Sequence, residues 1–180
     1  TAMGAIDGQL LRDQTRQMKE YVMRHLPDLL EQFESNVKAN GGQVHWVRNA
    51  DEANQVVLDI ARRTNSQKVV KSKSMATEET GLTRALEAAG VRVLETDLGE
   101  FVVQLDHDRP SHIVTPIIHK NRRVVARAFA RELGVEYTED PRALTMHARR
   151  YLRDVFRRCD LGVSGANFAV AETGSLCICT

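Results

Sequence analysis

The sequence predicts an α/β fold, with a mainly parallel sheet that carries helices on both faces and an N-terminal helical extension before it. From residue 43 onward, short apolar runs typical of strands alternate with amphipathic helical segments, which is the pattern of βαβ units. Residues 10–37 instead repeat apolar side chains at helical spacing. With 180 residues, of which 42% are hydrophobic, the chain can bury a core without disulfides or a structural metal.

The overall charge and the cysteines exclude several classes of protein. Twenty-five basic residues against 24 acidic ones leave a formal net charge of +1, so nucleic acid is not expected as a partner. No apolar run approaches the roughly 20 residues of a membrane helix, and the first residues lack the order of a secretion signal. We therefore expect no membrane span and a cytoplasmic location. Cys159, Cys177 and Cys179 show no CxxC spacing, so we expect reduced thiols and no metal site.

Two regions are predicted along the chain, a helical extension over residues 1–42 and an α/β domain over residues 43–180. Within the extension, Pro27 suits the first turn of a second helix, which Asn40-Gly41-Gly42 would end. The chain stops inside an apolar, strand-like run at residues 175–180. Because a strand needs a neighbour to pair its backbone, we expect a fragment whose α/β domain is incomplete at its C-terminus.

The individual elements follow from the apolar patterns. Strands are predicted over residues 43–48, 68–71, 91–96, 111–115, 168–170 and from 175 onward. Helices are predicted around residues 51–61, 77–89, 120–133 and 142–159. The apolar run 101–105 fits either a helix or a strand.

Polar residues are dense after four of the predicted strands. In an open parallel sheet, ligands bind outside the carboxyl ends of the strands, so these stretches should converge on one cleft. The candidate ligand-binding residues are Lys71, Ser72, Lys73, Ser74, Thr77, Glu78, Glu95, Asp97, Gly99, Glu100, His119, Glu172, Thr173 and Gly174. No catalytic residue can be singled out among them.

The loop after residue 71 offers backbone amides, hydroxyls and lysines that could hold a phosphate or carboxylate. It has neither a GxGxxG nor a GxxxxGK[ST] pattern, so backbone binding of a pyrophosphate is not supported. The alternative is a helix capped by Ser74 or Thr77, with solvated lysines.

The three carboxylates of Glu95, Asp97 and Glu100 lie within six residues, and Gly99 would permit a sharp turn between them. Clustered carboxylates raise one another's pKa, which can prepare a general acid or base. A solvated acidic turn is the alternative. His119 is an acid–base or ligand-contacting candidate, or else a surface residue, and the turn Glu172-Thr173-Gly174 would expose its glutamate to the cleft.

Four runs of the sequence resemble the lactate utilisation protein B family, whose members carry a lactate-utilisation (LUD) domain. They are Lys71 to Glu79, Glu95 to Phe101, Pro110 to Ile113 and Phe168 to Ser175. The resemblance extends over nearly the whole chain. It implies a fold similar to the group of glucosamine-6-phosphate isomerase, ribose-5-phosphate isomerase and coenzyme A transferase.

The same resemblance implies a role in the oxidation of L-lactate to pyruvate, as the electron-transferring subunit of a three-component system. Two [4Fe-4S] clusters are expected in the full-length protein, in a ferredoxin-like segment beyond residue 180, and none in this chain. The other subunits of the complex would be its partners.

Two alternatives to electron transfer stay open. The domain could be a small-metabolite enzyme of the sugar-phosphate isomerase or coenzyme A transferase type, acting on a small anionic substrate held by the loop after residue 71. It could also be a structural adaptor, in which case removing charges from the cleft leaves function unchanged.

Overall fold

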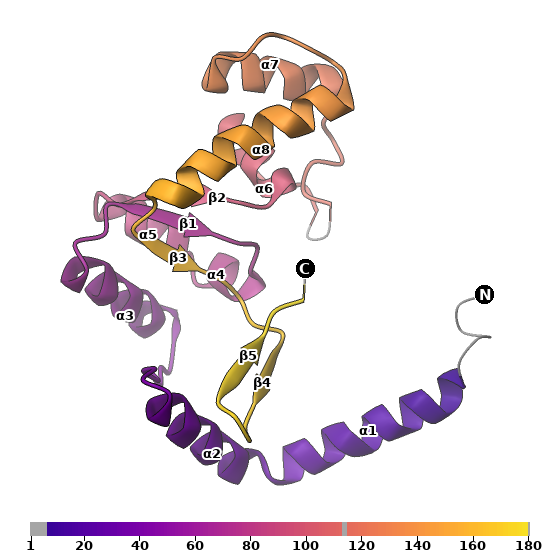
Figure 1. The fold of residues 1–180 in the computed structure, drawn as a ribbon, viewed down its shortest axis with the longest axis vertical. Coiled ribbons are helices and arrows are strands. Elements are labelled where there is room, and N and C mark those ends of the chain that lie inside the picture. Colours follow the sequence, from indigo (N-terminus) through magenta and orange to yellow (C-terminus); the bar gives the residue numbers. More distant parts are fainter. Residues whose placement is uncertain (1–6, 113–114, 180) are drawn as a thin grey trace. The chain divides into compact units, whose positions relative to one another are not determined.

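The computed structural model describes residues 7–112 and 115–179 (Figure 1). Contacts divide the chain into two compact units, one of residues 47–165 and one that joins residues up to 46 with those from 166 onward. None of the helices in the described part combines the length and hydropathy that a membrane crossing requires.

A three-stranded parallel sheet forms the centre of the unit of residues 47–165. Its strands are β1 (Lys68–Lys71), β2 (Arg92–Glu95) and β3 (Leu161–Val163), in the order β2-β1-β3. In the register of β1 with β2, Lys68 pairs with Arg92 and Lys71 pairs with Glu95. The predicted parallel α/β architecture is therefore confirmed.

Helices cover both faces of this sheet (Figure 1). On one face, Val69 and Val93 pack against α3 (Ala50–Arg63) and α5 (Leu82–Ala88), and the short helix α4 (Met75–Glu79) precedes α5. On the other face, Leu94 packs with α6 (Leu98–Leu105), α7 (Arg122–Leu133) and α8 (Pro141–Arg158). Neighbouring residues of a strand point to opposite faces, so Val93 and Leu94 anchor the two cores separately.

The ends of these helices follow their sequence signals. The side chain of Asp140 accepts a hydrogen bond from the backbone N–H of Ala143 at the start of α8. Gly134, with a φ of 64°, ends α7 in the left-handed conformation that favours glycine. Phe101 and Phe129 are buried between α6 and α7, with ring centroids 6.0 Å apart.

The second unit contains α1 (Gly8–Arg24), α2 (Leu26–Ala39) and an antiparallel hairpin of β4 (Phe168–Val170) and β5 (Ser175–Cys177). Asn36 donates hydrogen bonds to the backbone carbonyls of Ala171 (2.8 Å) and Glu172 (3.0 Å). Asn40, one helical turn later, donates to the carbonyl of Thr173 (2.9 Å). These bonds fasten the hairpin turn to α2.

Several predicted elements differ from those observed. Residues 43–48 are not a strand, because their backbone pairs with no ladder in the described chain, while the Trp46 indole N–H donates to Glu34. The strand expected at 111–115 is absent at Ser111, His112 and Thr115, and Ile113 and Val114 lie outside the described residues. The helix predicted at 77–89 is broken at Gly81, whose φ is 68°.

The C-terminal strands also differ from the prediction. β4 pairs only with β5 in the described chain, so the expectation that the strand before Glu172 extends the parallel sheet is wrong. The third parallel strand is β3, at residues where no strand was predicted. The boundary at residues 42 and 43 stays a prediction. The ambiguous run 101–105 lies within α6.

Candidate functional site

The sheet topology places a crevice at the carboxyl ends of β1 and β2. The chain after β1 leads to α5 on one face, whereas the chain after β2 leads to α6 on the other. Neighbouring parallel strands whose connections leave in opposite directions define the switch point where open α/β sheets bind ligands. The last residues of these two strands, Lys71 and Glu95, are register partners.

Lys71 is the centre of this crevice, and its side chain is 0% exposed. Its ammonium nitrogen lies 2.9 Å from Glu95 Oε1 and 3.1 Å from Glu78 Oε1, and it donates to Thr77 Oγ1 at 3.3 Å. Burial lowers the pKa of Lys71, but the hydrogen bonds and charges of Glu95 and Glu78 outweigh burial and raise it. Lys71 is therefore held as a cation.

Glu95 is the most constrained carboxylate of the crevice, with 10% of its side chain exposed. Its Oε2 is buried and has no hydrogen-bond partner in the described chain, while Oε1 pairs with Lys71. Burial raises the pKa of Glu95, and the nearby charges of Glu78 and Glu100 add to this rise against the opposing effect of Lys71. A buried acceptor without a donor costs about 1 to 3 kcal/mol, so Oε2 is suited to accept a hydrogen bond from a ligand.

The loop after β1 is built around Lys73, whose ammonium nitrogen lies 2.9 Å from Glu100 Oε1. The Asp97 carboxylate accepts a hydrogen bond from the backbone N–H of Lys73, and the hydroxyl of Ser72 donates to that of Ser164 at 2.9 Å. Ser74 caps α4 by accepting from the backbone N–H of Thr77, as predicted. The predicted residues 71–78 and 95–100 thus form one hydrogen-bonded network.

Carboxylates outnumber lysines in this network. Lys71 and Lys73 face the carboxylates of Glu78, Glu95, Asp97 and Glu100. A pocket of about 310 Å³ beside them is lined by Glu78, Glu87, Glu95, Glu100, Gln104 and Asp108, among others. A second pocket of about 260 Å³ lies over Lys73, Met75 and Pro110. The first pocket favours a ligand group that donates hydrogen bonds, and binding of an anion by the lysines stays a prediction.

Gly99 has a different role from the sharp turn expected of it. It lies within α6, and a Cβ atom there would lie 2.6 Å from Pro116 Cγ. Only a residue without a side chain lets the start of α6 pack this closely against the segment that carries His119.

His119 belongs to a neighbouring cluster of charged residues, which includes two aspartates and Lys120. Its Nε2 lies 2.9 Å from Asp108 Oδ2, and its Nδ1 lies 2.6 Å from the hydroxyl oxygen of Ser111. Lys120, whose side chain is 5% exposed, pairs with Asp106 (2.6 Å) and Asp108 (2.7 Å). Asp108 also lines the pocket that Glu95 borders, so the two clusters share that pocket.

The sequence analysis singled out His119 but not Asp106, Asp108 or Lys120. Lysine and aspartate at such separations are ordinary surface residues unless the chain between them folds back. Here residues 106–108 and 120 are brought together by a turn at 116–119. No local pattern signals this contact.

Glu172, Thr173 and Gly174 belong to the other unit, in the turn between β4 and β5. Their backbone is fixed on α2 by Asn36 and Asn40, and a Cβ on Gly174 would lie 2.6 Å from the backbone of Asn36. The side chain of Glu172 is exposed. This turn has a clear structural role in packing on α2, which the spacing of two asparagines on one helix face could have indicated.

The cysteines do not form a metal site in the described chain. Cys177 and Cys179 are exposed, and Cys159 is partly buried. Within residues 7–112 and 115–179, no three His, Cys, Asp or Glu side chains are grouped so that they could hold a metal ion. Three thiols do not supply the four that a [4Fe-4S] cluster needs, so these residues do not fit such a cluster.

The fold is that of an α/β domain with a parallel three-stranded sheet, and Lys71 and Glu95 lie at its switch point. Residues 30–180 match the LUD domain, and the chain belongs to the LUD domain family. No solved structure matches the chain.

Curated relatives extend this comparison. The chain is 46% identical over 169 residues to the protein named uncharacterized electron transport protein YkgF of Escherichia coli, covering 94% of the chain and 36% of that protein. It is 43% identical, with the same coverage, to lactate utilization protein B of Bacillus cereus. The protein of that name from Bacillus licheniformis is 44% identical over 170 residues. The chain thus spans about a third of the length of these relatives.

Proposed function

We propose that the protein containing this chain acts in lactate utilisation, as an iron–sulfur electron-transfer subunit in the oxidation of L-lactate to pyruvate. The observation that carries the proposal is the 43% identity to lactate utilization protein B along 94% of the chain. The name of the relative from Escherichia coli, an electron transport protein, supports the electron-transfer part. We place this reaction in the cytoplasm, together with other subunits of a lactate-utilisation complex.

The redox centre of this proposal lies outside the chain. Because the cysteines of the chain do not fit a [4Fe-4S] cluster, we assign the two expected clusters to other parts of the full-length protein. The LUD domain would then contribute binding, either of a small ligand or of a neighbouring subunit, through the crevice of Lys71 and Glu95. Lys71 fixes Glu95 Oε1, which leaves Oε2 available to the incoming hydrogen-bond donor.

A second candidate function is favoured by the same carboxylate. In a small-metabolite enzyme of the sugar-phosphate isomerase or coenzyme A transferase type, a carboxylate can serve as a nucleophile or as an acid or base that moves a proton. Glu95 combines burial, a raised pKa and an oxygen without a partner, all of which are typical of such a group. In this function the domain would turn over a substrate without partner subunits.

Growth on lactate tests the first function. A strain lacking the full-length gene and any second copy should fail to grow on L-lactate as sole carbon source, and the wild-type gene should restore growth. Glu95→Gln should restore growth poorly if the crevice takes part, whereas Glu136→Gln, which removes an exposed carboxylate, should restore it fully. Normal growth of the deletion strain on L-lactate would refute the proposal.

Activity assays with purified proteins distinguish the two proposed functions. Full-length protein reconstituted under anaerobic conditions with its partner subunits should reduce an electron acceptor when L-lactate is added, and the LUD domain alone should not. Isomerase or transferase turnover of a sugar phosphate or an acyl coenzyme A by the protein without partners would instead support the second function.

A further inference from the structure

A third pocket lies at the opposite end of the sheet from the crevice, at the amino ends of β1 and β2. It has a volume of about 220 Å³ and is lined by Lys68, Arg92, Tyr151, Asp154 and Arg158 around an apolar floor that includes Val70, Leu94 and Val155. Each strand has four residues, and adjacent residues rise about 3.3 Å. Lys68 and Arg92 therefore lie about 10 Å along the strands from Lys71 and Glu95, and neither Lys71 nor Glu95 lines this pocket.

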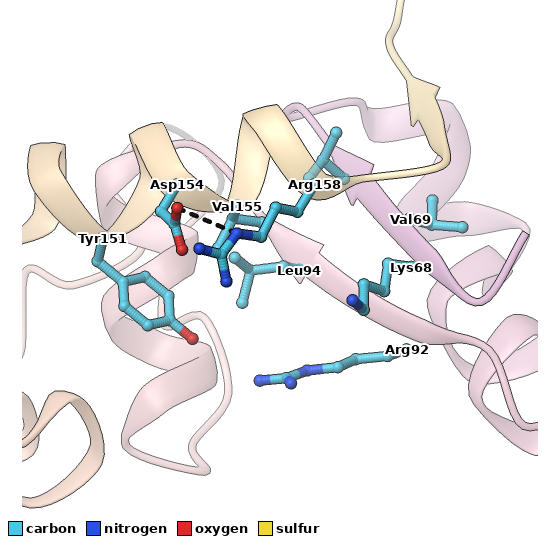
Figure 2. Close-up of a pocket in the computed structure, with 9 residues that line it drawn as sticks. Lys68, Val69, Arg92, Leu94, Tyr151, Asp154, Val155 and Arg158 are labelled. Carbon is cyan, nitrogen blue, oxygen red and sulfur yellow. Dashed lines mark ion pairs between the residues drawn. The ribbon is translucent and has the colours of Figure 1, made fainter.

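Two cations stand side by side at this end of the sheet. Lys68 and Arg92 are direct register partners on neighbouring strands. They alternate with Val69 and Val93 and so share the face of Val70 and Leu94, where Figure 2 shows both of their charged ends directed into the pocket. Like charges directly opposite each other on a sheet are destabilising. Both residues are exposed, so their two charged ends are accessible to an anion that would offset this repulsion.

The neighbouring carboxylates are already engaged. Asp154 pairs with Arg158 at 3.2 Å, the contact drawn as a dashed line in Figure 2. Asp160, beside the same strand end, accepts hydrogen bonds from the backbone N–H groups of Gln67 and Lys68, both at 2.9 Å. The backbone N–H groups of Gln67 and Lys68, with the charge of Lys68, lower the pKa of Asp160. In the described residues no ion pair within 4.0 Å involves the Lys68 ammonium or the Arg92 guanidinium.

The rest of the lining suits a ligand with an apolar body. Tyr151 is held by stacking on Phe101, with ring centroids 5.6 Å apart, and its hydroxyl end reaches the pocket (Figure 2). Leu94 and Val155 lie at the centre of the pocket in the same view. Because drug-sized ligands occupy about 300 Å³ or more, this volume suits a smaller metabolite.

We propose that this pocket binds a small anion, a carboxylate or phosphate monoester on a short apolar or aromatic body, between Lys68 and Arg92. The guanidinium of Arg92 presents a planar pair of donors that matches either oxyanion, and Lys68 adds a second charge. The apolar body lies on Leu94 and Val155 beside Tyr151. Arg158 offsets the negative end of the α8 dipole, which would otherwise disfavour an anion here. This site is independent of the function proposed above.

Binding of simple anions to the full-length protein tests the site. Benzoate and phenyl phosphate serve as probes of the two oxyanions, inorganic phosphate tests the need for an apolar body, and uncharged benzamide is the control. At constant ionic strength, calorimetric titration should show saturable binding of benzoate or phenyl phosphate, and the tighter of the two identifies the oxyanion. Benzamide should not bind, and inorganic phosphate should bind more weakly than phenyl phosphate.

Single substitutions test whether the anion binds between Lys68 and Arg92. Arg92→Gln and Lys68→Gln should each weaken binding roughly tenfold or more, since each loses a charge-assisted hydrogen bond. Arg84→Gln, on α5 at the other face of the sheet, removes the same charge and should leave the affinity unchanged. Without anion, the two pocket variants should melt at or above the Tm of the wild type, because a like-charge pair is relieved. Absence of saturable binding to the wild type, or undiminished binding in both pocket variants, would overturn the proposal.

Discussion

Two lysines in the unit of residues 47–165, the buried Lys71 and the partly buried Lys120, form similar clusters but have different surroundings. Lys71 and Lys120 each bridge two carboxylates at 2.6 to 3.1 Å, and their side chains are 0% and 5% exposed. The partners differ in one respect. Lys71 pairs with Glu95, which is 10% exposed, and with Glu78, which is 48% exposed, whereas Asp106 and Asp108 are 20% and 43% exposed. Lys71 therefore has one partner inside the protein, Glu95, and one that water reaches, whereas water reaches both partners of Lys120.

The pKa values of Glu95 and of the two aspartates shift in opposite directions in the two clusters. Burial raises the pKa of Glu95, and one of its oxygens has no partner. Hydrogen bonds from Lys120, assisted by His119, lower the pKa of Asp108 well below its ordinary range, and Lys120 also lowers that of Asp106. In the Lys120 cluster, both aspartates are paired with Lys120, and these pairs connect residues 106–108 with residues 119 and 120. The Lys71 cluster keeps an unsatisfied acceptor at the switch point, as a binding site does.

Removing the buried lysine should have the largest effect. Lys71→Met leaves Glu95 as a buried, unpaired carboxylate, and breaking a buried pair from one side costs about 3 to 5 kcal/mol. We expect the free energy of unfolding to fall by this amount at pH 8, as measured by urea denaturation.

The loss should shrink in acid, because Glu95 can take up a proton. Its folded pKa is raised above the ordinary 4.5, so protonation removes the unpaired charge while the pH is still above that value. A deficit in Lys71→Met that is constant between pH 8 and pH 5 would show that Glu95 is not the group left unpaired.

Lys120→Met should cost less, since water can solvate the aspartates that it leaves behind. Asp106 and Asp108 have folded pKa values below the ordinary 3.8, so their contribution is present above that value and is lost as the pH falls through the folded values. The deficit of Lys120→Met should therefore persist at pH 5 and close only below about pH 3.8. Urea titrations of both lysine variants over pH 3 to 8 compare the two clusters directly, and closure in the same pH range would remove the distinction.

The sequence predicted the Lys71 cluster but not the Lys120 cluster, and the reason is physical. Lys71 and Glu95 end strands whose apolar patterns are plain, and the rule for parallel sheets then places their side chains at one edge. Asp108 and Lys120 meet only because a turn reverses the chain between them, and local periodicity carries no information about such a turn. The same limit explains β3, a three-residue strand that is defined by its pairing with β1.

Glu172 shows a different limit of the sequence analysis. The turn at Thr173-Gly174 and the strands on either side of it were predicted, but nothing local shows which sheet a strand will join. β4 pairs with β5 across this turn, and Asn36 and Asn40, more than 130 residues away, bind the turn. Polar density after a strand therefore indicates a site only when that strand belongs to the parallel sheet.

The contact between Gly99 and Pro116 joins the two clusters, so Gly99→Ala should disturb both. Alanine in a helix is favoured over glycine by about 1 kcal/mol, whereas overpacking costs about 1 to 3 kcal/mol. With Cβ 2.6 Å from a proline ring carbon, the steric cost should prevail, for a net loss of about 1 kcal/mol. Gly90→Ala is not a suitable control, because the φ of Gly90 is 82° and alanine would be strained there. Ala85→Gly, within α5, is the control for the difference in helix propensity between alanine and glycine.

Stabilisation of the protein by Gly99→Ala would refute the close packing of Gly99 on Pro116.

His119→Gln should have the smallest effect on stability. His119 contacts Asp108 and Ser111, but Lys120 remains to hold Asp108, and changes at partly exposed positions usually stay within about 0.5 kcal/mol. Glutamine keeps a hydrogen-bonding side chain but cannot act as an acid or a base.

If His119 only holds Asp108 and Ser111 in place, His119→Gln should support growth on L-lactate as the wild type does. A variant that folds with wild-type stability but fails to restore growth would show that His119 acts at the pocket shared with Glu95. Lys120 would then position His119 through Asp108, which contacts both residues, and Lys120→Met should impair growth beyond what its loss of stability explains.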